Sequence, residues 1–163
     1  MPDRLFGLPA HPLLVHVPVV LLPLAALLML WLLYRPQHLH LLGFPLVGCS
    51  FVSLVGSVLA VETGEGLERI LNEPSKALER HAQMGERTRL IAAVFFVLVV
   101  AFVVLGRRWN AARTVHGGVL PRSKAFIAVG AVAALLGIFA VGTVVATGHS
   151  GAKLAWEDTG KSG

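Results

Sequence analysis

The sequence predicts an all-α fold, a bundle of four helices that each cross a lipid bilayer. Of the 163 residues 55% are hydrophobic and only 14% are charged, whereas roughly a quarter of the residues in a soluble domain are charged. The apolar residues form four blocks, at 13–33, 41–61, 90–106 and 125–147. About 20 residues cross the hydrocarbon layer, so three blocks are long enough and the third is marginal. Because lipid cannot pair with backbone groups, each block predicts a helix, and we expect one domain over 1–163.

The first predicted helix combines internal prolines with two histidines at its start. The stretch Leu5–Tyr34 has no charged residue, yet it contains His11 and His16. An imidazole beside hydrocarbon costs free energy unless it is paired, ligated or in contact with water. Pro18 and Pro23 each remove a backbone hydrogen bond, so we expect them to bend the helix. The block is longer than the apolar part of a cleavable signal peptide and follows no basic stretch, so we expect it to be retained.

Small residues recur about every four positions along the second and fourth predicted helices. The second helix carries Gly56, Ala60 and Gly64, and the fourth carries Gly130, Ala134, Gly142 and Ala146. This spacing lets helix backbones approach closely, and a homo-oligomer through these two helices is one expected result. The third helix is rich in Val and Phe without an interior glycine, which favours lipid contact or a bulky core.

The connection between the second and third helices, 62–89, is predicted to be partly helical. Thr63-Gly64 is typical of a helix end in which the glycine is left-handed. Residues 67–71 fit a short amphipathic turn on the membrane surface. After a break at 72–74, a second helix is expected to start at the proline and to run through His81 into the third membrane helix.

The charged residues divide unequally between the two ends of the bundle. Four crossings place both termini at one end, called end A, with the connection 62–89 and a tail that is expected to leave the membrane after Thr147. End B carries the connections 35–40 and 107–124. End A has all nine acidic and eight basic residues, whereas end B has six basic residues and no acidic one. The denser Lys and Arg of end B favour a cytoplasmic end B and an extracytoplasmic end A. Loop charge rather than nucleic-acid binding then explains the pI of about 10.2.

Four of the seven histidines lie at end A, and they are His11, His16, His81 and His149. Facing histidines at one end of a four-helix bundle are what a b-type haem or a bound metal requires. Haem b is the first candidate and copper or zinc the alternative, because imidazole binds all of them. Glycines beside the histidines leave space for a planar macrocycle, at positions Gly85, Gly148 and Gly151. Three arginines lie at the depth where haem propionates would emerge, namely Arg80, Arg87 and Arg89.

A structural interpretation of the same histidines remains open, in which no cofactor is bound and they only hydrogen-bond neighbouring helices. His11 and His16 are about 140° apart around a helix, so they do not face one target. His16 would then bond a carbonyl of the fourth helix or the carboxylate of Glu62. In the metal interpretation Glu62 is a ligand or orients a ligating imidazole. At end B we expect solvent or headgroup contact for the remaining histidines, His38, His40 and His116.

Several motifs of end A together resemble a known family. They are His11-Pro-Leu-Leu-Val-His16-Val-Pro18, Glu62-Thr63-Gly64-Glu65, the lone His81, and Thr147-Gly-His149-Ser-Gly-Ala-Lys-Leu-Ala-Trp156. Over nearly its whole length the chain resembles the bacterial membrane-protein family catalogued as "domain of unknown function 2231". The resemblance implies a four-helix domain of the bacterial inner membrane, and the fusion of some relatives to c-type cytochromes implies electron transfer near the outer face. The family supplies no catalytic residue, and the valine after His16 departs from the phenylalanine that relatives often carry.

We therefore expect an electron carrier rather than an enzyme, with a quinone or a redox protein as its partner. A non-enzymatic scaffold or accessory subunit is the alternative, and a zinc or copper site that handles metal is a third interpretation. The single cysteine, Cys49, excludes an iron–sulfur cluster held by this chain alone and covalent c-type haem attachment. Apart from Cys49 no apolar block has an ionisable residue at mid-depth, which argues against a pump or a polar channel.

Overall fold

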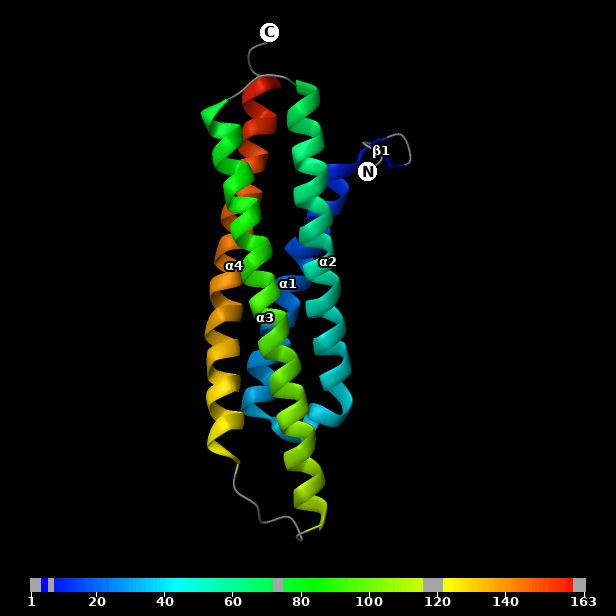
Figure 1. The fold of residues 1–163 in the computed structure, drawn as a ribbon, viewed down its shortest axis with the longest axis vertical. Helices are drawn as coiled ribbons and strands as arrows, with labels where there is room; N and C mark the ends of the chain where they lie inside the picture. The colour runs from blue at the N-terminus through cyan, green and yellow to red at the C-terminus, as the bar shows by residue number, and fades with distance from the viewer. Residues whose placement is uncertain (1–3, 6–7, 72–74, 116–121, 160–163) are drawn as a thin grey trace.

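Four long helices run side by side along the long axis of the molecule (Figure 1). The computed structural model describes residues 4–5, 8–71, 75–115 and 122–159. The helices are α1 (Ala10–Tyr34), α2 (Leu39–Leu71), α3 (Lys76–Val115) and α4 (Lys124–Thr159), with a short 3-10 helix, η1 (Pro36–His38), between α1 and α2. Two antiparallel strands of two residues each, β1 (Arg4–Leu5) and β2 (Leu8–Pro9), precede α1. The predicted all-α, four-helix fold is confirmed.

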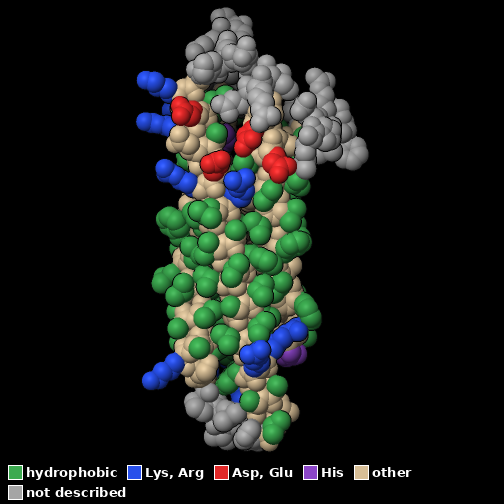
Figure 2. Space-filling view, viewed as in Figure 1, with side chains coloured by type: hydrophobic (Ala, Val, Ile, Leu, Met, Phe, Trp, Pro, Cys, Tyr) green, Lys and Arg blue, Asp and Glu red, His purple; other side chains and the backbone are tan. Residues whose placement is uncertain are grey.

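The surface of the bundle is that of a membrane protein. Each of the four helices is long and apolar enough to cross a bilayer, and each contains one of the predicted blocks. A belt of hydrophobic side chains covers the middle of the molecule, and charged side chains gather at its two ends (Figure 2). Large apolar side chains in the belt, such as Val20, Leu27 and Leu135, are more than 60% exposed. A continuous apolar surface of this kind requires hydrocarbon around it, so the chain is a multi-pass membrane protein in contact with lipid.

Two of the predicted helix ends are wrong. Thr63-Gly64 does not end a helix, because α2 continues through it to Leu71 and includes the residues that were expected to form a separate surface turn. A glycine inside a helix costs only about 1 kcal/mol, which packing against a neighbouring helix can offset. α4 likewise continues past Thr147 to Thr159. The helix expected to lead into the third span is confirmed, since α3 is unbroken from Lys76, whereas the break at 72–74 lies outside the described residues.

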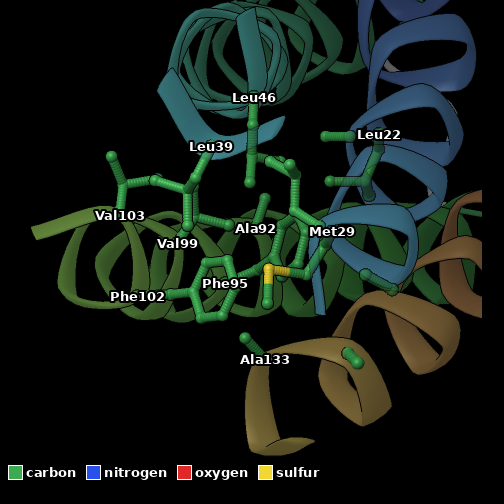
Figure 3. Packing of buried hydrophobic residues seen from close by; sticks show 14 of the residues in the cluster. Leu22, Met29, Leu39, Leu46, Ala92, Phe95, Val99, Phe102, Val103 and Ala133 are labelled. Carbon is green, nitrogen blue, oxygen red and sulfur yellow. The ribbon is translucent and has the colours of Figure 1, made fainter. Parts of the chain in front are cut away.

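The helices pack in a cyclic order that leaves α1 and α3 on a diagonal. α1 packs against α2 and α4, and α3 packs against the same two helices. The core between them is filled by wholly buried large side chains, among them Met29 of α1, Leu46 of α2, and Phe95 and Phe102 of α3 (Figure 3). The bulky residues of α3 thus form the core, while others such as Val97 face the lipid side.

Most of the small residues at helix contacts serve packing within this one chain. A Cβ atom at Gly56 of α2 would lie 2.6 Å from Cγ1 of Val17, so α1 and α2 approach closely here. A Cβ at Gly130 of α4 would lie 2.9 Å from the ring of Phe102. Gly142 differs, because it is exposed and a Cβ there would meet no atom within 4 Å. A homo-oligomer through α2 and α4 therefore stays a prediction, with Gly142 on a face that a second copy could reach.

Candidate functional site at end A

At end A the long helices continue beyond their apolar segments. The part of α3 between Lys76 and Leu90 holds six charged residues, so it lies outside the hydrocarbon layer. His81 lies on this part of α3. His11 lies in the first turn of α1, at the same end of the bundle. The two histidines reach each other from helices that face one another across the bundle.

His11 is held between α1 and α2. Its Nδ1 atom donates a hydrogen bond to the carbonyl oxygen of Ala60 at 2.8 Å. Because a carbonyl oxygen can only accept, this partner assigns the hydrogen of the neutral ring to Nδ1. A Cβ atom at Gly64, one turn further along α2, would lie 3.1 Å from Cε1 of His11. The glycine that the sequence suggested as a helix end instead leaves room for this imidazole.

His81 joins α3 to α4 by an analogous arrangement. Its Nδ1 lies 2.7 Å from Oγ of Ser150, and the Ser150 hydroxyl donates its own hydrogen to the carbonyl of Thr147 at 2.8 Å. Ser150 Oγ therefore accepts from His81, which again assigns the ring hydrogen to Nδ1. A Cβ atom at Gly151 would lie 2.9 Å from Cε1 of His81, so a glycine again makes room for the ring.

The two imidazoles, called the histidine pair below, meet across the bundle. Their ring centroids are 6.1 Å apart, and their planes are nearly perpendicular at 88°. In a neutral imidazole only one ring nitrogen carries a hydrogen, so a ring that donates from Nδ1 in its neutral form has a lone pair on Nε2. Burial lowers the pKa of the His81 imidazole below its ordinary value of 6.5; the nearby His11 lowers it further, and a hydrogen bond with the Thr147 backbone acts in the opposite direction. His81 is thus neutral near pH 7, and neutral imidazole is the form that binds metals.

The other predicted ligands lie apart from the histidine pair. His16 is exposed, and its Nδ1 donates to the carbonyl of Pro12 in its own helix rather than to α4 or Glu62. His149 and Glu62 are also exposed. Over the described residues, no three His, Cys, Asp or Glu side chains are grouped closely enough to hold a metal ion. The structure thus brings together two of the four predicted histidines.

The predicted arginines and glycines of end A have different surroundings. Arg80 and Arg87 are exposed and Arg89 is half-buried, all on α3 within eight residues of His81. Gly151 offers no space for a macrocycle, because His81 fills it. Space remains beside Gly148, where a Cβ would meet nothing within 4 Å, and beside Gly85, where it would meet only Val61 at 3.6 Å.

Sequence reasoning missed the partners that hold the histidine pair. The Ala60 carbonyl has no signature in the sequence, and Ser150 was not singled out because the sequence analysis considered its neighbour His149 instead. At end B, the histidines near η1 contact the protein itself: His38 accepts a hydrogen bond from the Trp31 indole at 3.1 Å, and His40 donates to the Gln37 carbonyl at 2.7 Å. His116 lies outside the described residues.

Comparison with known proteins agrees with the motifs of end A. A family model described as "Predicted membrane protein (DUF2231)" matches residues 7–162, which include all four helices. The chain belongs to the DUF2231 family. No curated protein and no solved structure matches the chain. The function of this DUF2231 protein must therefore be argued from the geometry of its own residues.

Proposed function

We propose that this DUF2231 protein is a membrane electron carrier in which His11 and His81 are the two protein ligands of one redox-active metal centre, a b-type haem. The observation that carries the proposal is the state of the histidine pair. Each imidazole hydrogen-bonds a fixed partner through Nδ1, and in the neutral ring this leaves Nε2 free to bind a metal. Metal-binding histidines commonly have this second hydrogen bond, which fixes the ring and raises its basicity.

The separation of the rings supports a shared metal. Imidazole nitrogen binds first-row metals at about 2 Å, so two imidazoles in line on one ion have ring centroids about 6 Å apart. The observed distance is 6.1 Å. Rotation of an imidazole about its metal–nitrogen bond would not change the length of that bond, so the angle of 88° between the planes is compatible with a shared ion.

The number of protein ligands favours haem over a bare ion. A structural zinc ion takes four ligands, most of them from protein, whereas a haem would bring four nitrogens for its iron and would need at most two ligands from protein. The histidine pair supplies two. Arg80, Arg87 and Arg89 would pair with the propionates of the haem. The haem would supply the one-electron chemistry, and a quinone or redox protein would be the exchange partner. Copper, which also binds imidazole, is the alternative metal.

The expected setting is the bacterial inner membrane with end A on the extracytoplasmic side. The distribution of Lys and Arg supports this orientation, since the short connections of end B are denser in these residues than end A is. A redox centre held by the histidine pair would then lie at the outer face, while the apolar belt holds the protein in lipid.

A second candidate function is a scaffold or accessory subunit with structural histidines. It is favoured by the fact that each imidazole hydrogen bond joins two helices, His11 joining α1 to α2 and His81 joining α3 to α4. In this case the histidine pair closes end A of the bundle without a ligand. Loss of either imidazole would then lower stability and leave any absorption spectrum unchanged.

The test is an absorption spectrum with metal analysis of the protein purified in mild detergent from cells that make haem. The proposal expects a Soret band that is lost in His11→Ala and in His81→Ala but kept in the matched variants His16→Ala and His149→Ala. Copper without a Soret band would shift the assignment to copper. Colourless, metal-free wild-type protein would refute the metal centre and favour the scaffold function. A Soret band that is lost only in His16→Ala or His149→Ala would refute His11 and His81 as the ligand pair.

A further inference from the structure

End B carries a concentration of positive charge that no acidic residue balances. End A is near neutral, with eight basic and nine acidic residues, whereas end B has six basic residues and none acidic. These six residues, called the basic ring below, are Arg35, Arg107, Arg108, Arg113, Arg122 and Lys124. The lower end of the molecule in Figure 2 accordingly shows Lys and Arg side chains without Asp or Glu.

Exposed aromatic side chains hold several of these guanidinium groups. The Cζ atom of Arg107 lies 4.1 Å from the ring centroid of Phe44, and that of Arg35 lies 4.9 Å from the ring centroid of Tyr34. Both rings are about two-thirds exposed, at 68% and 67%. Stacking on an aromatic face fixes the plane of a guanidinium while its N–H groups remain available as donors.

The basic ring lies at the depth of the lipid headgroups. Leu41 and Phe44 are both more than 60% exposed at the start of α2, so hydrocarbon reaches this level of the bundle. Trp31 and Tyr34 are exposed at the end of α1, where aromatic residues mark the membrane interface. Arg122 approaches the same interface, since its Nη1 donates to the carbonyl of Leu33 at 3.3 Å.

We propose that the basic ring binds the phosphate groups of anionic phospholipids. Planar guanidinium groups pair with phosphate oxygens through two parallel hydrogen bonds, and no carboxylate at this end competes for them. End A has a near-equal number of acidic and basic groups, so it offers no comparable site. This inference does not depend on the histidine pair or on any cofactor.

The test is native mass spectrometry of the full chain, titrated with phosphatidylglycerol or with phosphatidylcholine of the same acyl chains. Wild-type protein is expected to bind phosphatidylglycerol more tightly. Each basic side chain near an anionic surface contributes about a fivefold gain in binding, so R35Q/R107Q should weaken phosphatidylglycerol binding about 25-fold and leave phosphatidylcholine unchanged. The matched variant K76Q/K153Q removes the same charge at end A and should stay within about twofold of wild type.

Two further measurements separate charge from geometry. R35K/R107K keeps the charge but loses the planar donors, so its affinity for phosphatidylglycerol should lie between those of wild type and R35Q/R107Q. For wild-type protein, raising NaCl from about 50 to 500 mM should weaken phosphatidylglycerol binding, because salt screens exposed charges. Equal affinity for the two lipids, equal losses in the two double glutamine variants, or a salt-independent preference would each overturn the proposal.

Discussion

Gly56→Ala tests the close packing of α1 on α2. The added Cβ would lie 2.6 Å from Val17 Cγ1, 2.8 Å from Val17 Cβ and 3.1 Å from Pro18 Cδ. Val17 Cβ is fixed to the backbone, and the Pro18 ring is closed onto it, so neither atom can turn aside. Ordinary contact begins at 3.4 Å and the fixed Val17 Cβ lies at 2.8 Å, so α1 and α2 must separate by about 0.6 Å. A gap of this size forfeits about a quarter to a half of the dispersion energy of each contact along the interface.

The magnitude follows from two opposing terms. Overpacking of a well-filled interior costs about 1–3 kcal/mol, and alanine in place of glycine gains about 1 kcal/mol of helix propensity. Gly48→Ala is the matched control, since Gly48 lies in the same helix and a Cβ there meets nothing within 4 Å. Gly48→Ala therefore gains helix propensity without any overpacking. The difference between the two variants therefore isolates overpacking, and Gly56→Ala should be about 1–3 kcal/mol less stable than Gly48→Ala.

The assay is unfolding in mixed micelles with a rising fraction of dodecyl sulfate, followed by tryptophan fluorescence and helical circular dichroism. Gly56→Ala should unfold at a lower fraction of dodecyl sulfate than wild type, and Gly48→Ala at an equal or higher one. Equal midpoints for the two variants, or greater stability of Gly56→Ala, would show that α1 and α2 do not approach as described.

Three further predictions use the same unfolding assay. The free energy of unfolding should fall as the pH drops below 6.5, because the unfolded chain binds a proton at His81 with its ordinary pKa of 6.5 whereas the folded state, with a lowered pKa, does not. This contribution to stability is fully present above pH 6.5. The variant His81→Asn should lose the dependence of stability on pH in this range. Phe126→Ala should cost about 3–5 kcal/mol, since this wholly buried ring stacks on Phe102 at 4.7 Å and on Trp109 at 5.9 Å, and a loss below about 1 kcal/mol would contradict that packing. Ser150→Ala removes the side-chain partner of His81 Nδ1 while the Thr147 backbone still hydrogen-bonds the ring, so it should cost about 0.5–1.5 kcal/mol, whereas an unchanged midpoint would show that the His81–Ser150 hydrogen bond is not made.

The membrane helices could be predicted because hydrocarbon imposes one requirement on every residue of a span. A long apolar block in lipid can satisfy its backbone hydrogen bonds only as a helix, so all four helices could be predicted. The ends beyond the apolar blocks follow weaker rules. Gly64 and Thr147 look like helix ends from local propensity, yet α2 and α4 continue, and Gly64 and Gly151 pack there against imidazoles of neighbouring helices. Where α2 and α4 end is therefore decided by tertiary contacts, which cannot be read from the local sequence.

The candidate site was predictable in residue type and location but not in its pairing. Helix geometry correctly indicated that His11 and His16 do not share a target. The meeting of His11 with His81 depends on the rotation of α1 and α3 about their axes and on their diagonal placement. Both are decided by packing, with Gly64 and Gly151 making room for the rings. The residues next to a glycine in the sequence do not indicate that a side chain from another helix packs against it.

The continuity of α3 has a mechanical consequence. One unbroken helix of 40 residues contains His81 near one end and Arg107 near the other, about 39 Å apart along its axis. Such a helix behaves as a strut, so a rigid tilt of about 5° about its midpoint moves each end sideways by about 1.7 Å in opposite directions. The His11–His81 contact and the Arg107–Phe44 contact therefore both depend on the position of the same rigid helix. A tilt of α3 that displaces one of them also displaces the other, on the opposite side of the bilayer.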